Sequence, residues 1–434
     1  MKEQFEIKGY WFLPGKEDNR VAGTLYFTPD KGITLELIGS FHEHLEFLQV
    51  SFDENAKTTA MIWGESSDAK AITLIDCHAY GSLNLSASFP MQNFSARYLL
   101  AGIHLEQIDN TVFNSISVQL PFLTAWVNNY RVKYSLQFGD SGVNGFELGY
   151  HLDDNNIIAV QLDPELALEI EFSCTPPSTS TTEVLNIQQG YQLNLNTVLP
   201  QSFQHLLKKA NRFNTFLQFG TLKELSFEKI TLINPDDYQE LTDGRKHFHP
   251  VELFYRQYPP ATERLSSTKD FLFTYDIITG SFSDLIKKWF GFDIQMAPIL
   301  KHLINSISPK DLFDTGDFLV VIQALEGYAT RFRPNIPKTG KKLTLKDQLN
   351  ALWSEFSFIS CIKNLKLDVG TAVNSRHYYS HFFSKKANAH VADGVELYKL
   401  TQSLKVLLIC CVLSETGFDQ QSMSTIMSKY PIGN

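Results

Sequence analysis

The chain has 434 residues, of which 43% are hydrophobic and 20% charged, and its formal net charge is −9. This length exceeds a typical single core, so two or three domains are expected, and the apolar content excludes a disordered protein. No run approaches the ~20 apolar residues of a membrane span, and the charged N-terminal residues do not resemble a signal peptide. The five cysteines lack the spacing of a metal site. We therefore expect a reduced, soluble, cytoplasmic protein.

The first 280 residues are predicted to be mainly β-structure. Short segments rich in β-branched and aromatic residues alternate polar with apolar side chains, and Gly, Pro, Asn and Asp separate them. The predicted strands span 23–29, 32–39, 47–52, 71–76, 116–122, 130–138, 167–173, 227–234, 251–257 and 271–277. A loop is predicted at 174–183 and one helix at 202–219. This spacing predicts an antiparallel sandwich or barrel rather than a parallel sheet.

From about residue 281 the apolar period becomes helical. The predicted helices begin after Ser281 or Ser283, span 316–332, begin again at Thr344, and end with a pair at 394–413 and 419–429; a basic, proline-containing loop occupies 333–342. We predict a multidomain β + α protein. A large antiparallel β-sandwich or barrel-like N-terminal domain (1–280) precedes an all-α bundle of four to six helices (281–434).

The charge is distributed unevenly between these two parts. Residues 281–434 contain 18 Lys and Arg against 13 Asp and Glu, a balance of +5. Residues 1–280 contain 20 against 34, a balance of −14. Such asymmetry weakly indicates a polyanionic partner on the basic side, although acidic and basic domains are also common without one.

The residue types of Arg376 and His381 favour phosphate chemistry. Arginine stays cationic at any working pH and binds phosphate oxygens with a planar fork of donors. Histidine has a reference pKa of ~6.5, so it takes or gives a proton near neutrality. RNA carries its own nucleophile, the 2′-hydroxyl, so a protein that positions the strand and moves protons can cut it without a metal.

The spacing of this pair raises a geometric difficulty. On an ideal helix, residues five apart lie ~140° from alignment, so Arg376 and His381 converge only at a helix start or bend, or with help from a second chain. Asn374 and Ser375 are good N-cap types, which places Arg376 near a first turn. His377 and His381 share a helix face, as two metal ligands would, but no Glu or third His completes the set.

Other motifs give little support for different chemistry. Two H-x-H pairs, His42 with His44 and His247 with His249, lack a third ligand and are interpreted as exposed or hydrogen-bonded histidines. The sequence contains no P-loop, no GxGxxG and no GxSxG. We expect neither a metal nor another cofactor.

The run Arg376-His-Tyr-Tyr-Ser-His381, with the residues after it, resembles the HEPN domain of the ApeA-like type. Those domains share an R-x4–6-H signature with a polar residue directly after the arginine, which His377 provides, and the upstream QALE (Gln323–Glu326) is similar to the family pattern. The N-terminal domain of ApeA-like antiphage proteins is similar to GYWFLP (9–14), GTLYFTPDKGITLELIG (23–39), IWGE (62–65), ITLIDC (72–77) and LPFLTAW (120–126). The Tyr-Tyr-Ser interior of the motif is less diagnostic.

The resemblance implies a metal-independent ribonuclease that acts in antiviral abortive infection. Two HEPN domains would pair so that both motifs face one groove. His381 would deprotonate the 2′-hydroxyl or protonate the leaving 5′-oxygen, and Arg376 would hold and neutralise the phosphorane. His377 would orient the site. Glu326 would either hydrogen-bond Arg376 or remain a solvated helix carboxylate.

The resemblance also implies partners. These are host RNA, with tRNA as one candidate, a second copy of the chain bound through residues 281–434, and a phage-derived trigger bound by the N-terminal domain. Lys385 and Lys386 would follow the RNA backbone or remain solvated lysines.

Two alternatives remain open from the sequence. One is a catalytically silent HEPN module that dimerises and binds RNA, against which the intact Arg376 and His381 argue. The other is a ligand- or glycan-binding β-sandwich with a helical appendage, which only the strand pattern supports.

Overall fold

The computed structural model describes most of the chain. The described residues are 3–41, 58–81, 91–140, 142–150, 157–175, 188–258, 268–307, 315–340, 342–365, 367–381 and 390–430. The chain folds into two compact units. The first comprises Met1–Thr124, Tyr130–Asn214 and Leu225–Arg264, and the second comprises Ala125–Asn129, Thr215–Glu224 and Leu265–Asn434. Short segments from the β-rich part of the sequence therefore belong to the second unit.

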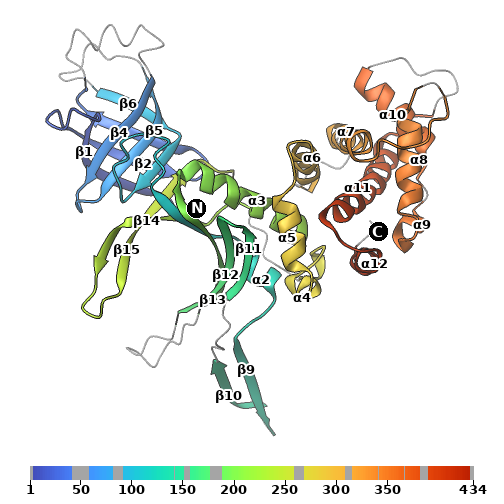
Figure 1. Ribbon diagram of the computed structural model, residues 1–434, viewed down its shortest axis with the longest axis horizontal. Coiled ribbons are helices and arrows are strands. Elements are labelled where there is room, and N and C mark those ends of the chain that lie inside the picture. Colours follow the sequence, from blue (N-terminus) through green and yellow to red (C-terminus); the bar gives the residue numbers. More distant parts are fainter. Residues whose placement is uncertain are drawn as a thin grey trace. The chain divides into compact units, whose positions relative to one another are not determined.

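The first unit is built on one antiparallel sheet of thirteen strands, in the order β11-β12-β13-β8-β14-β15-β7-β5-β4-β1-β2-β3-β6. These strands are β1 Phe5–Phe12, β2 Val21–Thr28, β3 Gly32–Ile38, β4 Thr58–Ser66, β5 Ala71–Tyr80, β6 Met91–Ala96, β7 Tyr98–Ala101, β8 Phe113–Gln119, β11 Ile157–Asp163, β12 Leu166–Thr175, β13 Gln188–Gln201, β14 Lys229–Glu240 and β15 Lys246–Tyr255. An additional β5–β6 pairing closes the run from β5 through β4, β1, β2 and β3 to β6 into a barrel (Figure 1).

The barrel interior is formed by alternating inward-facing residues, as β2 shows. In β2, Leu25 and Phe27 point inward and are fully buried, while their neighbours face outward. Trp11 of β1 is also fully buried. A Cβ atom on Gly64 of β4 would lie 2.4 Å from the Trp11 ring, so the absence of a side chain there makes room for the indole.

The strands beyond the barrel extend the sheet from β5 and carry the helix α3 (Phe203–Thr221). The predicted helix at 202–219 is confirmed. Its first turn packs on the sheet, because the Phe203 ring lies 5.3 Å from the ring of Tyr98 in β7. A separate hairpin of β9 (Val132–Gly139) and β10 (Gly142–Tyr150) forms its own two-stranded sheet.

The second unit is helical. It contains α2 Leu123–Val127 in part, α4 Tyr275–Ile278, α5 Phe282–Phe290, α6 Ala297–Ile307, α7 Thr315–Phe332, α8 Leu345–Glu355, α9 Ser360–Asn364, α10 Val369–His381, α11 Gly394–Thr416 and α12 Gln420–Ser428, after a 3-10 turn at Thr268–Asp270. The described residues thus hold more helices than the four to six expected. Of the additional helices, α4 and α9 are short and α10 carries no apolar stripe, whereas α6 has a buried apolar stripe that the sequence analysis did not identify.

The core of this unit is α11. It contacts α5, α6, α7, α8, α9 and α12, and every residue from Val406 to Leu413 is buried. The helix is long and apolar enough to cross a membrane by length and composition alone, but most of it is buried inside the bundle. Its apolar character is therefore accounted for by its position as a core helix.

An aromatic cluster joins the short early segments to the bundle. Trp126, Phe216 and Phe282 pack together with ring centroids 6.0–6.4 Å apart, and the Trp289 ring stacks on Phe219 at 5.7 Å. The strand predicted at 271–277 is wrong, because this segment is irregular and then enters α4. Residues 271–273 are buried, and a short buried apolar run cannot be assigned to strand or helix by periodicity alone.

The expected architecture, an antiparallel β-domain followed by a helical bundle, is confirmed, and part of the sheet closes into a barrel while further strands extend from it. The predicted helix start at Thr344 is confirmed, because Thr344 is the N-cap of α8 and forms a capping box with Asp347. Hydrogen bonds from the hydroxyls of Thr339 and Thr344 lower the pKa of Asp347 to about 2. The predicted strand at 47–52 lies outside the described residues, and the boundary at residue 280 stays a prediction.

Candidate functional site

The motif residues lie on α10, which begins earlier than the sequence suggested. The Asp368 carboxylate accepts the backbone N–H of Thr371 at 3.1 Å and its hydroxyl at 2.8 Å, as an N-cap residue does. These hydrogen bonds lower the pKa of Asp368. Arg376 therefore lies inside the helix rather than near its first turn, so the prediction based on Asn374 and Ser375 as N-caps is wrong.

Arg376 is held by a carboxylate from another helix. Its Nη2 donates to Oε2 of Glu326 on α7 at 3.0 Å. About a quarter of the Arg376 side chain and a third of the Glu326 side chain are exposed. The ion pair therefore fixes the guanidinium while leaving part of it open to a ligand.

Arg376 and His381 meet within one chain. Arg376 Nη1 lies 3.2 Å from His381 Nε2, so the expected divergence of the pair is wrong. The two side chains do leave α10 in different directions, but the arginine side chain is long enough to reach His381, which is the last residue of the helix. Because guanidinium only donates hydrogen bonds, this contact requires Nε2 to be the acceptor, which is the neutral imidazole carrying its proton on Nδ1.

His377 lies beside His381. The two rings are stacked with centroids 6.0 Å apart and planes inclined by 28°. This follows from the i,i+4 spacing, which puts both side chains on one helix face. His377 is therefore placed next to the candidate base, and its role in orienting the site stays a prediction. Lys385 and Lys386 lie outside the described residues.

The motif helix is anchored to the segment before α11. The backbone N–H of Ala392 donates to Oγ of Ser375 at 3.0 Å, and the Tyr379 hydroxyl donates to the Ala392 carbonyl at 2.9 Å. Ser375 and Ala392 are fully buried. Sequence reasoning missed this clamp. Its signal was the i,i+4 spacing of Ser375 and Tyr379, which puts both on the face of α10 opposite the solvent.

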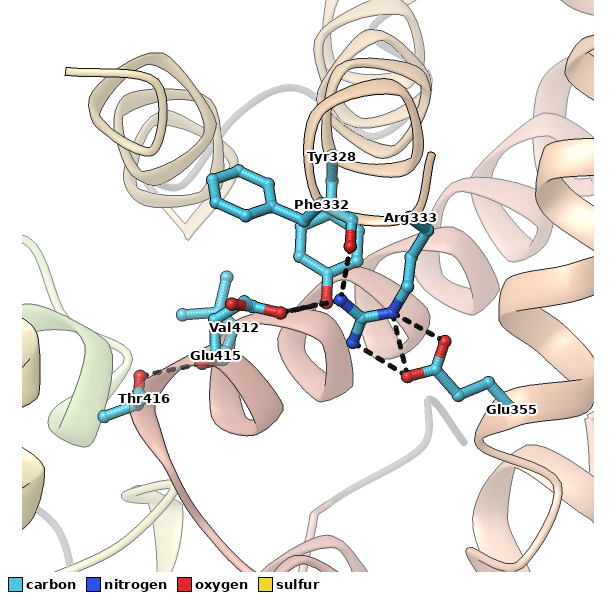
Figure 2. A network of polar contacts seen from close by, with 7 residues as sticks. All are labelled: Tyr328, Phe332, Arg333, Glu355, Val412, Glu415 and Thr416. Carbon is cyan, nitrogen blue, oxygen red and sulfur yellow. Dashed lines mark hydrogen bonds and ion pairs between the residues drawn. The ribbon is translucent and has the colours of Figure 1, made fainter. Parts of the chain in front are cut away.

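The helix that carries Glu326 is fixed by a second charged network just beyond its end (Figure 2). Arg333 donates to both carboxylate oxygens of Glu355 on α8 at 2.8–3.1 Å and to Glu415 of α11 at 2.8 Å. The Tyr328 hydroxyl donates to the same Glu415 oxygen at 2.9 Å. Hydrogen bonding to Glu355 raises the pKa of Arg333, and burial raises the pKa of Tyr328.

A further ion pair holds the start of α7. Lys405 Nζ of α11 lies 2.7 Å from Asp317 and donates to the Ser306 carbonyl at the end of α6 at 2.6 Å. Both charged side chains are largely buried. Together with the Arg333 network, this pair ties both ends of α7 to α11.

The remaining histidine motifs do not assemble a site. His249 pairs with Asp237 at 2.7 Å on an exposed part of β15, beside His247. The described residues contain no group of three or more His, Cys, Asp or Glu side chains placed to hold a metal ion. His42 and His44 lie outside the described residues.

Known protein families match both parts of the chain. Residues 6–289 match the family model described as ApeA N-terminal domain 1, and residues 319–422 match the model described as Apea-like HEPN. The second match contains the whole set of Glu326, Arg376, His377 and His381. No curated protein and no solved structure matches the chain.

Replacing Arg333 with methionine should destabilise the bundle. The substitution keeps an aliphatic side chain but leaves Glu355 and Glu415 without their cation, and hydrogen bonds to charged groups contribute about 2 kcal/mol. We expect the thermal midpoint of the full chain to fall by roughly 4–8 °C. The matched control is Arg331→Met, because Arg331 is exposed and, among the described residues, its side chain donates to the backbone carbonyl of Gln295 and to no carboxylate. Equal midpoints for the two variants would contradict the role assigned to the network.

Proposed function

Since the chain belongs to the ApeA-like HEPN family of antiphage effectors, we propose that it is a metal-independent endoribonuclease. It would cleave host RNA, with tRNA as one candidate, during abortive infection. The observation that carries the proposal is the arrangement of Arg376 between the carboxylate of Glu326 and the Nε2 atom of His381. A cation for phosphate and a neutral imidazole for proton transfer then lie together on one helix.

In the proposed reaction each residue has a separate task. His381, with its lone pair on Nε2, accepts the proton of the 2′-hydroxyl as this oxygen attacks the adjacent phosphorus. Arg376 donates hydrogen bonds to the non-bridging oxygens and neutralises charge that develops on them. A protonated histidine then gives a proton to the leaving 5′-oxygen. Glu326 keeps the guanidinium oriented, so it is a positioning residue, and His377 supports the ring of His381.

Removing either motif side chain should abolish cleavage without unfolding the chain. We expect His381→Ala and Arg376→Ala each to lower the rate by roughly 10²–10⁴-fold, the usual effect of losing an acid–base or charge-stabilising group. The measurement is single-turnover cleavage of a total RNA or tRNA pool. His390→Ala is the matched control, since His390 is exposed and pairs with Glu396. Wild-type rates in both motif variants would show that the catalytic assignment is wrong, whereas no cleavage by the wild-type chain itself would indicate the silent binding module.

The products should identify the nucleophile. Attack by the 2′-hydroxyl leaves a 2′,3′-cyclic phosphate and a 5′-hydroxyl, and the reaction needs no Lewis acid. We expect full activity in EDTA and no cleavage of an RNA that carries a 2′-O-methyl group at the cut site. Mass spectrometry of the product ends checks this directly. A strict requirement for Mg²⁺ or Mn²⁺ would rule out the mechanism.

We also propose that the active form is a homodimer through residues 281–434, in which both motifs face one groove. Each chain already joins its own Arg376 and His381, so the second copy would supply the opposite wall of the groove. Wild-type chains can be re-equilibrated with an equal amount of the Arg376→Ala/His381→Ala double variant. If both motifs are needed, random pairing leaves about a quarter of the dimers intact. Activity strictly proportional to the wild-type chain would show that one chain suffices.

A further inference from the structure

The hairpin of β9 and β10 has one face made of apolar side chains. Residues directly opposite each other in a sheet share a face, and Phe138 pairs with Val143, Leu136 with Phe146, and Tyr134 with Leu148. Simple alternation along β10 would put Val143 on the opposite face from Phe146 and Leu148. A β-bulge between Val143 and Gly145 shifts the register by one residue and returns Phe146 to the apolar face.

The opposite face of the hairpin is polar. Ser135 lies opposite Glu147, and Gln137 lies opposite Gly145, while Lys133 follows the same alternation. The two faces therefore differ as the solvent face and the core face of a buried sheet do. The sequence encodes a core-like surface on a hairpin that supplies no strand to the large sheet.

This apolar face is exposed. The exposed fractions on β9 are 73% for Tyr134, 46% for Leu136 and 73% for Phe138, and those on β10 are 57% for Val143, 66% for Phe146 and 37% for Leu148. Among the described elements, β9 and β10 contact each other extensively and contact no other element to a comparable degree. An isolated two-stranded hairpin is only marginally stable in water, so the surface is expected to have a partner.

The size of the face matches what a specific contact requires. A fully exposed aromatic side chain presents about 150–250 Å², so these six side chains present roughly 600 Å² in all, at the upper end of the largest apolar patches on monomers, which are often functional. Two such faces packed together would bury roughly 1,200 Å², which lies at the lower end of specific protein interfaces.

We propose that this face binds the same face of a second copy of the chain, forming a two-layer β-contact about a two-fold axis. An isologous interface places each group near its own equivalent, which a charged surface would oppose. The apolar face carries no charged side chain, because Lys133 and Glu147 both lie on the other side. Two pleated apolar faces stack readily at about 10 Å. Insertion into a bilayer is disfavoured, because Asp140 follows directly after the end of β9.

This inference does not rest on ribonuclease activity, and it concerns a contact separate from the one proposed for residues 281–434. If both contacts form in one dimer, each raises the effective concentration for the other. Such a dimer would join two N-terminal β-domains as well as two helical units.

Cross-linking of the full chain tests the contact locally. Leu136→Cys and Gln137→Cys are neighbours on opposite faces, and both are made in a Cys174→Ser background because the other four cysteines are buried. A bismaleimide that spans about 10 Å should link two copies through position 136 at least about tenfold faster than through position 137. Adding Phe146→Glu should suppress the link, because it puts a carboxylate into an apolar contact, whereas adding Ser135→Glu should not.

Equal cross-linking through positions 136 and 137, or an undiminished link with Phe146→Glu, would overturn the proposal. So would binding to liposomes that Phe146→Glu abolishes, with no two-copy species from Leu136→Cys, since the face would then be a membrane surface. Loss of ribonuclease activity in His381→Ala leaves the cross-link unchanged, so failure of this proposal is distinguishable from failure of the proposed function.

Discussion

Burial of α11 is the constraint on which the helical unit depends. A helix that is apolar all round must be covered on every side, and the neighbouring helices of the bundle cover this one. Burial alone does not decide which residues of a neighbour face it. The charged residues near the two ends of the apolar run do this, because Lys405 must meet Asp317 and Glu415 must meet Arg333. Leaving either largely buried charge without its partner would lower the stability of the bundle.

These two ion pairs also determine where Glu326 lies. Both involve α7 or the residue that follows it, so the position of α7 along α11 and its rotation are fixed at both ends. Glu326 lies between the two anchor points and meets Arg376 of α10. On the other side, the Ser375 and Tyr379 clamp fixes α10 to Ala392. The motif thus depends on part-buried contacts whose partners lie 87 and 99 residues apart in sequence.

The helices and strands could be predicted from the sequence where one apolar periodicity dominates a segment. Residues 316–332 show a clear apolar stripe, and the helix is there, whereas VGTAVNSRHYYSH has polar side chains on most positions and gives no helical signal apart from its cap at Asp368. Barrel closure depends on β5 pairing with β6 as well as with β4, and the register of this closing pair has no local signature. The identities of Arg376, His381 and Glu326 followed from the motif and the resemblance. Their contact within one chain did not, because angular spacing on a helix ignores the reach of an arginine side chain.

The contact between Arg376 and His381 has a consequence for the proposed reaction. While Nη1 donates to Nε2, the lone pair needed to accept the 2′-hydroxyl proton is occupied. Guanidinium has five N–H donors, and the two named contacts leave others for a phosphate. An incoming phosphate competes with the neutral imidazole for Arg376, and it is the stronger acceptor because it is charged. In the proposed reaction, binding of RNA would therefore release the base as the nucleophile arrives, while the ion pair with Glu326 would keep the guanidinium oriented.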